Sequence, residues 1–485
     1  MKLTTASAAL LLLTAVNAHD LPRRHASFAK RQFTAAAAGT SSVAAAAGST
    51  VASGTVAATG TVAATPALDT GTSVPPLSSI TSGMATQATF PVSSTYTAGA
   101  TPPISGAPAL PSKFVYSSAD WPIADKTPDT TSDEVQEWMK ELDGWDIPDI
   151  DPSTDGTCAG STEAAANAQA NGWWTCGGYT RDTDIVACPD KMTWGVSFDD
   201  GPSPYTQTLL NYLGSVNLTA TFFVVGSRVV ERPDVLIEEY MAGHEISVHT
   251  WAHPHLTTLT TEQIVAELGW SRKAIQTVLG ITPTTMRPPY GDIDDRVRAI
   301  SLAMGMVPII WTSSPSSGPF DTNDWRVAGG LVTGPEQLAT FEGLLGNATT
   351  LDTGFIVLEH DLFEITVDLA RGYTIPAALS HEPPFTLKSI GSCQGWPATD
   401  LYLETTTNTT FPYSNSTVST NGTADSDSSD GTGVRGNSAS SGSSTSTADA
   451  DQAQSTSGAS HVVPQAITFG LLFTLSLAIV GASAF

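Results

Sequence analysis

The sequence predicts an α/β fold with parallel strands, and three observations support this prediction. Between Cys188 and Cys393, short apolar runs typical of strands alternate with segments of helical periodicity. Parallel strands require crossover connections, which helices of this length provide. Clusters of polar residues follow the apolar runs, at the carboxyl ends of strands, where such folds gather ligands. The pattern does not separate a closed barrel from an open sheet.

The expected elements alternate in order along this region. Strands are expected at residues 192–198, 219–226, 244–250, 284–291, 306–312 and 354–360. Helices are expected at residues 205–215, 232–243, 260–280, 294–305 and 336–345. The longest helix has Thr260 as its expected N-cap, because a threonine hydroxyl can accept a hydrogen bond from the first turn.

From Gln32 to about Pro111 the 485-residue chain consists mainly of Ala, Thr, Ser, Gly and Pro with almost no charge and no strand or helix periodicity, and a second low-complexity region runs from about Thr405 to His461. The start of the chain combines one lysine, an apolar run and a small-residue end at Ala18, which is typical of a secretory signal peptide. Dibasic pairs at Arg23–Arg24 and Lys30–Arg31 indicate a propeptide cut near Gln32. The predicted organisation is a signal peptide (1–18), a propeptide and disordered Ala/Thr/Ser-rich stalk (19–111), an N-terminal extension (112–187), the folded domain (188–399), a Ser/Thr-rich glycosylated linker (400–461) and a terminal signal tail (462–485).

The tail ends in about twenty apolar residues with no cationic residue after them. Small residues near Ser457, a polar spacer and this apolar end favour a GPI-anchor signal, with Ser457 as the attachment site, over a single membrane span. The predicted location is therefore secreted and anchored by GPI to the plasma membrane and cell wall. N-glycosylation sequons are at Asn217, Asn347, Asn408, Asn415 and Asn421.

Cysteine count and net charge narrow the class of protein further. An even number of cysteines in an oxidising compartment favours two disulfides over a zinc site. Of the three possible pairings we favour Cys188 with Cys393, which would join the ends of the domain, and Cys158 with Cys176. The formal charge of −26 argues against nucleic acid as a partner, since nucleic acid is also polyanionic.

The polar clusters have the composition of a catalytic metal site. His249 and His253 are four residues apart, which on one helical turn would place both imidazoles on one face. One carboxylate from another strand end would complete an Asp/His/His set with an open position, as in catalytic zinc sites. Asp199 and Asp200 are adjacent after the first strand and would point to opposite faces of it. One could bind the metal while its neighbour acts as general base on an activated water.

Further strand ends offer the remaining groups for acid–base chemistry. Arg287 can hold the base through a charge-assisted pair. His360 is the candidate general acid, because the pKa of histidine lies near working pH. A buried carboxylate from the segment "DTNDW", which begins at Asp321, could orient this histidine and raise its pKa.

The ordered set "SFDDGP", "HTWAH", "RPPY", "DTNDW" and "IVLEH" resembles the five motifs of the polysaccharide deacetylase family, the family-four carbohydrate esterases. The resemblance covers about Cys188 to Cys393, and the five motifs in order are far more specific than any one of them. It implies a distorted (β/α) barrel and metal-dependent removal of N- or O-acetyl groups from glycans. Ser197 stands where this family commonly has threonine.

The resemblance also implies a role for each motif residue. It implies that Asp199 is the catalytic base, positioned by Arg287, and that His360 is the general acid, oriented by Asp324. The implied metal ligands are Asp200, His249 and His253, with zinc as the expected ion and cobalt as the alternative. The backbone N–H of Tyr290 would hold the oxyanion, while Trp325 and Leu358 would line the acetyl pocket and groove.

The substrate is inferred from the context of the domain rather than from its motifs. Secretion, dibasic processing and a GPI tail are typical of a fungal wall protein, and the N-acetylated polymer of such walls is chitin. The leading hypothesis is therefore a monomeric chitin deacetylase that acts on chitin or N-acetylglucosamine oligomers and yields chitosan and acetate. Two alternatives are an esterase for O-acetyl xylan or another glycan, and a wall structural protein with a vestigial deacetylase domain.

Overall fold

The computed structural model describes residues 73–86, 89, 91–92, 96–314 and 318–410. The predicted signal peptide, the dibasic sites, most of the stalk, Asn415, Asn421, Ser457 and the terminal tail lie outside these residues. Within the described ranges, no helix is both long and apolar enough to cross a membrane. Asn217, Asn347 and Asn408 are described, and all three are exposed, as glycosylation would require.

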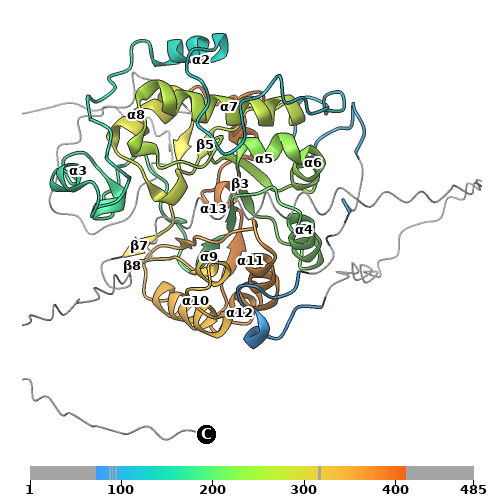
Figure 1. The fold of residues 1–485 in the computed structure, drawn as a ribbon. Coiled ribbons are helices and arrows are strands. Elements are labelled where there is room, and N and C mark those ends of the chain that lie inside the picture. Colours follow the sequence, from blue (N-terminus) through green and yellow to red (C-terminus); the bar gives the residue numbers. More distant parts are fainter. Residues whose placement is uncertain (1–72, 87–88, 90, 93–95, 315–317, 411–485) are drawn as a thin grey trace, which may run out of the picture. The chain divides into compact units, whose positions relative to one another are not determined.

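The centre of the fold is a set of parallel strands (Figure 1). One sheet has the order β2 (Ser197–Asp199), β3 (Thr221–Val224), β4 (Glu245–Val248), β5 (Thr285–Met286) and β6 (Val307–Pro308). A second has the order β10 (Thr386–Lys388), β1 (Thr193–Gly195) and β9 (Phe355–Ile356). The α/β class and the parallel arrangement predicted from the sequence are confirmed.

The two sheets join into an irregular closed barrel. β1 and β2 are one strand interrupted at Val196, so this strand belongs to both sheets. On the far side, the N–H of Thr312, which follows β6, donates to the carbonyl of Ile356 in β9 at 3.0 Å. The strand order therefore runs around a ring, and the short strands and single bridges make that ring a distorted one. An antiparallel pair, β7 (Ser313–Ser314) with β8 (Gly318–Pro319), stands apart from it.

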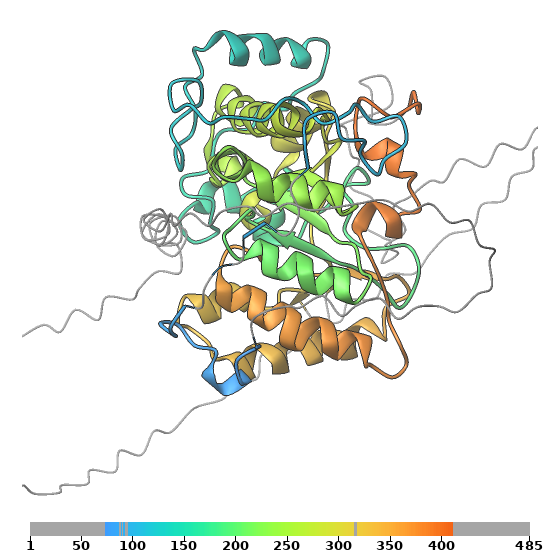
Figure 2. The same cartoon turned by 90° about the vertical axis from the view of Figure 1, so that its right-hand side faces the viewer.

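Helices follow the strands as expected and cover the barrel on the outside (Figure 2). The predicted helices appear as α4 (Thr206–Ser215), α6 (Pro233–Met241), α7 (Thr261–Leu279), α8 (Asp295–Ala303) and α10 (Gly334–Ala348). Thr260 caps α7 through a capping box with Gln263, which confirms the predicted start of that helix.

Several short helices were not predicted from the sequence. They are α2 (Asp133–Trp138), α3 (Thr162–Ala166), α5 (Gly226–Glu231), α9 (Asp324–Ala328), α11 (Glu364–Leu369), α12 (Ile375–Leu379) and α13 (Ile390–Cys393). Each has at most six residues, which is too short for a helical period to be recognised. The predicted strands were also too long, because their ends become the loops that carry polar residues.

The amino ends of the barrel strands are fastened covalently and by hydrogen bonds. Here the disulfide Cys188–Cys393, which spans 205 residues of sequence, joins the start of the domain to α13. The N-terminal extension contains the second disulfide, Cys158–Cys176, so both favoured pairings are present. At the start of β4, the buried Glu245 accepts hydrogen bonds from the N–H groups of Gly391 (2.8 Å) and Ser392 (3.0 Å). This end of the barrel is thus tied to the last helix of the domain.

Candidate active site

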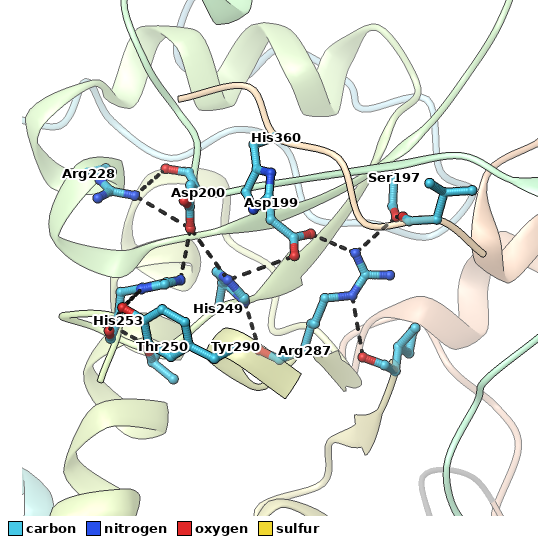
Figure 3. A network of polar contacts seen from close by, with 12 residues as sticks. Ser197, Asp199, Asp200, Arg228, His249, Thr250, His253, Arg287, Tyr290 and His360 are labelled. Atoms are coloured by element: carbon cyan, nitrogen blue, oxygen red, sulfur yellow. Dashed lines mark hydrogen bonds and ion pairs between the residues drawn. The ribbon is translucent and has the colours of Figure 1, made fainter. Parts of the chain in front are cut away.

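The predicted site residues come together at the carboxyl ends of the barrel strands (Figure 3). Asp199 ends β2, His249 follows β4 and Arg287 follows β5. His360 follows β9 and forms a parallel bridge with Asp199. Residues separated by more than 160 positions in the chain therefore share one site, as the position of each motif after a strand predicted.

The two adjacent aspartates do not point to opposite faces, as strand geometry had suggested. Asp199 is the last residue of β2, but Asp200 has left the strand and has φ of 80°. Left-handed backbone turns the second carboxylate back toward the first. As a result, Asp199 Oδ2 lies 3.9 Å and Asp200 Oδ1 lies 3.5 Å from the same atom, His249 Nε2. The prediction was wrong because it treated both residues as extended.

The two histidines also meet by a different route from the one predicted. Residues 249–253 form a loop after β4 and not a helical turn. Thr250 and His253 have φ of 64° and 61°, in the left-handed region that a β-branched residue rarely adopts. This backbone brings the two imidazole rings to 5.0 Å between centroids. The spacing of four residues was therefore informative, although its helical explanation was wrong.

The geometry of the three predicted ligands fits a metal ion. One ligand atom from each of Asp200, His249 and His253 can be chosen so that all three lie within 4.8 Å of one another. Asp200 Oδ1 is buried and accepts no hydrogen bond, although His253 Nε2 lies 3.0 Å from it. A buried carboxylate oxygen left without a donor is costly unless a ligand satisfies it.

The outer nitrogens of both histidines have partners that set the tautomer a metal requires. His249 Nδ1 lies 2.8 Å from the carbonyl oxygen of Arg287, which can only accept, so this nitrogen carries the proton. His253 Nδ1 lies 3.0 Å from the hydroxyl of Tyr290, which in turn donates to the carbonyl of His253 at 3.4 Å. Both Nε2 lone pairs therefore face Asp200, as in metal sites whose histidines are oriented by outer hydrogen bonds.

Asp199 is held by a buried cation. Arg287 Nη1 donates to Asp199 Oδ1 at 2.7 Å and to the hydroxyl of Ser197 at 3.0 Å. Arg287 is fully buried, and Asp199 is 1% exposed. Asp199 Oδ2 remains directed toward the ligand cluster, at 3.9 Å from His249. Serine at position 197 supplies the hydroxyl that the more common threonine would supply, so the departure from the motif leaves this contact in place.

His360 and Asp324 form the second predicted pair. The Nδ1 of His360 donates to Asp324 Oδ1 at 2.7 Å, and the backbone N–H of His360 donates to Asp324 Oδ2 at 2.8 Å. Burial on its own would lower the pKa of His360, but Asp324, with Asp200 and Asp199, outweighs it and raises that pKa to about 10. The imidazole therefore carries a proton at neutral pH.

The three remaining predicted residues lie around this cluster. Tyr290 has φ of 62°, and its ring packs edge-to-face on His253 at 4.6 Å between centroids. Trp325 directly follows Asp324 in α9, and its Nε1 donates to Asp321 Oδ2 at 3.2 Å. Leu358 is 8% exposed and precedes His360 by two residues. The roles of Trp325 and Leu358 in lining the acetyl pocket and groove stay predictions.

The sequence analysis missed one charged residue of the site. Arg228, in α5, donates from Nη1 to the backbone oxygen of Asp200 at 2.6 Å and lies 3.8 Å from the Asp200 carboxylate. The contact holds the left-handed residue in place with a buried cation, since Arg228 is 7% exposed. An arginine in the first turn after β3 resembles a surface residue in the sequence, and no local pattern indicates this contact.

Residues 187–309 match the family described as polysaccharide deacetylase. A protein of Cryptococcus neoformans var. grubii named chitin deacetylase 1 is 53% identical over 345 residues, which cover 70% of this chain and 72% of that protein. The chain belongs to the polysaccharide deacetylase family. A chitin deacetylase of Amylomyces rouxii is 32% identical over 282 residues, covering 53% of this polysaccharide deacetylase and 63% of the relative. The solved structure of the chitin deacetylase from Colletotrichum lindemuthianum aligns with 24% identity and a TM-score of 0.40, over 46% of this chain and 97% of that one.

Proposed function

We propose that this polysaccharide deacetylase removes N-acetyl groups from chitin and N-acetylglucosamine oligomers, releasing acetate and leaving chitosan. The observation that carries the proposal is the convergence of an Asp/His/His cluster, a buried Asp199–Arg287 pair and a protonated His360 at one end of the barrel. The name of the relative with 53% identity supports chitin as the substrate. The coexistence of base, acid and ligand set counts against a vestigial domain.

A zinc ion held by Asp200, His249 and His253 would polarise the acetyl carbonyl and supply an activated water. Asp199 Oδ2 faces the same cluster and would take a proton from the attacking water, while Arg287 holds the other oxygen of this carboxylate. The water oxygen bonds to the acetyl carbon. The backbone N–H of Tyr290 stabilises the negative charge that develops on the carbonyl oxygen.

The second half of the reaction depends on His360. The bond between the acetyl carbon and the sugar nitrogen breaks, and protonated His360 gives its proton to the leaving amine. Asp324 accepts the hydrogen bond from Nδ1 of His360 and so orients the ring. The proton that His360 gives to the amine is therefore the one on the other ring nitrogen, Nε2. The products are acetate and a glucosamine unit of the polymer.

We also propose that the enzyme is a secreted monomer that a GPI anchor attaches to the plasma membrane and cell wall. The apolar tail after Ser457, the small residues near it and the signal-peptide pattern support this proposal. Zinc is the proposed metal because two imidazoles and one carboxylate with an open position suit it, and cobalt is the alternative.

The proposed activity is tested by acetate release from chitin oligomers before and after removal of metal with a chelator. Release from chitin that stops on chelation and returns with zinc supports the proposal. Preferential release from acetylated xylan would instead indicate an O-acetyl esterase. Absence of release from both substrates, with zinc bound, would indicate a wall protein with an inactive domain.

A further inference from the structure

The loop that carries both histidine ligands has an unfavourable backbone conformation. Thr250 and His253 adopt positive φ, which is unfavourable for a non-glycine residue and persists only where neighbouring groups enforce it. The loop contains little that could enforce it: one internal hydrogen bond joins the N–H of His253 to the hydroxyl of Thr250 at 3.0 Å. The restraint must come from elements packed around residues 249–253.

The carbonyl groups of the loop are held by the start of helix α5. The N–H of Gly226 donates to the carbonyl of Thr250 at 2.9 Å, and the N–H of Ser227 donates to the carbonyl of Trp251 at 3.2 Å. The first turn of a helix has free N–H groups, so these contacts use donors that are already oriented. They fix the acceptors of the loop but leave the donors of Trp251 and Ala252 to be satisfied.

One buried carboxylate satisfies both of these donors. Glu267 Oε2, from helix α7, accepts the N–H of Trp251 at 2.9 Å and the N–H of Ala252 at 2.8 Å. Glu267 and Trp251 are both fully buried. Without Glu267, two adjacent N–H groups between the metal ligands would lose their acceptor, and the N–H of the fully buried Trp251 could not readily replace it with water.

The side chain of Trp251 is anchored by the N-terminal extension. Its ring stacks on Trp121 at 6.0 Å between centroids with an interplanar angle of 6°, and its Nε1 donates to the carbonyl of Ile123 at 3.2 Å. Both partners precede the segment that matches the family, which begins at residue 187. Two elements therefore hold the middle of the loop. Helix α7 accepts hydrogen bonds from its backbone, and the N-terminal extension packs against the ring of Trp251.

We propose that Glu267 is a positioning residue for the metal: it fixes the loop between His249 and His253, so that metal affinity depends on it although it contacts neither ligand. The inference rests on the proposed metal site at Asp200, His249 and His253. Burial raises the pKa of Glu267 to about 7, so a neutral side chain of the same shape is close to one of its own states. Glutamine at this position should therefore substitute well, whereas a side chain without an acceptor should not.

The chain offers a matched control at the start of β4, the strand that the histidine loop follows. Glu245 is also a buried glutamate that accepts two backbone N–H groups, at 2.8 and 3.0 Å, but it lies at the start of β4 and away from the ligands. Loss of its acceptors should lower stability as loss of Glu267 does. It should leave zinc binding unchanged, because no ligand-bearing loop depends on it.

The test uses the full-length chain with substitutions Glu267→Leu, Glu267→Gln, Glu245→Leu and Glu245→Gln. The dissociation constant for zinc is measured by competition with a coloured chelator, and hydrogen exchange follows the amides of Trp251 and Ala252 in the metal-free protein. We expect Glu267→Leu to weaken zinc binding by about 10- to 100-fold and to speed exchange at these two amides. Glu267→Gln should restore most of the affinity, and both Glu245 variants should bind zinc within about twofold of the wild type.

Two results would overturn the proposal: wild-type zinc affinity in folded Glu267→Leu, or an equal loss of affinity in Glu245→Leu. If Glu267→Leu does not fold, Glu267→Asp takes its place, because it keeps the charge but retracts the acceptor by one methylene; unchanged affinity in that variant also overturns the proposal. A wild-type protein that binds no zinc would refute the metal site itself, which separates failure of the proposed function from failure of this inference.

Discussion

The two ends of the barrel each contain a buried carboxylate, and the surroundings of these two carboxylates differ. At the amino ends of the strands, Glu245 is surrounded by donors: the hydroxyls of Thr221 and Ser389 lie 2.6 Å from its oxygens, and two backbone N–H groups complete the set. At the carboxyl ends, Asp200 Oδ1 and Arg287 Nη2 are buried without a hydrogen-bond partner. Both oxygens of Glu245 thus have donors, which stabilises the fold, whereas Asp200 Oδ1 stays available for a ligand.

The backbone follows the same division. Of the eight non-glycine residues with positive φ in the described part of the chain, five lie in loops around the site: Asp200, Thr250, His253, Tyr290 and Asn323. Such strain gathers where side chains must be aimed at a ligand, and the remaining structure has to hold it. The strained backbone at the carboxyl end positions side chains for a ligand and lowers the stability of the fold. Favourable interactions at the amino end and in the core offset this loss.

The largest effect is expected when each of the two adjacent aspartates is substituted on its own. Asp199→Asn should retain zinc but lose activity by on the order of 10²- to 10⁴-fold, because it removes the base and keeps its shape. Asp200→Asn should weaken zinc binding, because it removes the anionic ligand. Zinc content by elemental analysis and acetate release from chitin oligomers measure both effects. Added zinc should partly rescue Asp200→Asn and leave Asp199→Asn inactive; the reverse pattern would mean that the two roles are exchanged.

A smaller effect is expected in the pH dependence of the acid. Burial lowers the pKa of His360, but Asp324 outweighs it and raises that pKa above its ordinary value, so the imidazole is protonated at neutral pH and loses its proton only on the alkaline side, where activity should fall. Asp324→Asn removes the carboxylate that does most to raise this pKa, and the alkaline limit of kcat should move to lower pH. At alkaline pH we expect a loss on the order of tenfold or more.

The profile of kcat against pH, with zinc saturating, measures this shift. A bound metal would offset the contribution of Asp200 to the pKa of His360, but not that of the hydrogen bond that His360 donates to Asp324. An alkaline limit that is unchanged in Asp324→Asn would show that another group supplies the proton. The acidic limb should be the same in both proteins, because Asp324 does not contact Asp199.

The amino end should show the converse behaviour when its disulfide is removed. Replacing Cys188 and Cys393 with serine opens a loop of 205 residues and should reduce the free energy of unfolding by about 2–5 kcal/mol. Zinc affinity and kcat at low temperature should be unchanged, because the disulfide lies at the end of the barrel away from the site. Denaturant unfolding and zinc titration of the same sample check this; a variant that is fully stable, or one that folds but has lost zinc, contradicts the division between the ends.

The sequence predicted the order of the long helices and of most barrel strands, and the identity of most clustered residues, because these depend on local signals; the short helices, β10 and Arg228 gave no such signal. Apolar runs and helical periods mark the strands and helices, and polar motifs mark the strand ends. The loop geometry was not accessible in this way. Left-handed φ is expected at glycine and, less often, at asparagine or aspartate, so nothing in the sequence marks the β-branched Thr250 as turning there. Glu267 likewise resembles any charged residue of an amphipathic helix, and its proposed role depends on backbone groups fifteen and sixteen residues earlier in the chain.

The N-terminal extension was predicted as a separate segment, and its contact with the site gives the smallest effect. Trp121 packs against Trp251 without touching a ligand, and it also meets Trp270 edge-to-face at 5.8 Å between centroids. Trp121→Ala should remove the aromatic contact with Trp251, while Glu267 and α5 still hold the backbone of the loop. We therefore expect zinc to bind only several-fold more weakly, near the lower limit for residues outside the ligand set. Zinc titration of Trp121→Ala beside Trp138→Ala measures the effect, since Trp138 packs on Trp270 but not on Trp251. Equal losses in the two variants would mean that the extension stabilises helix α7 in general and does not act through the histidine loop.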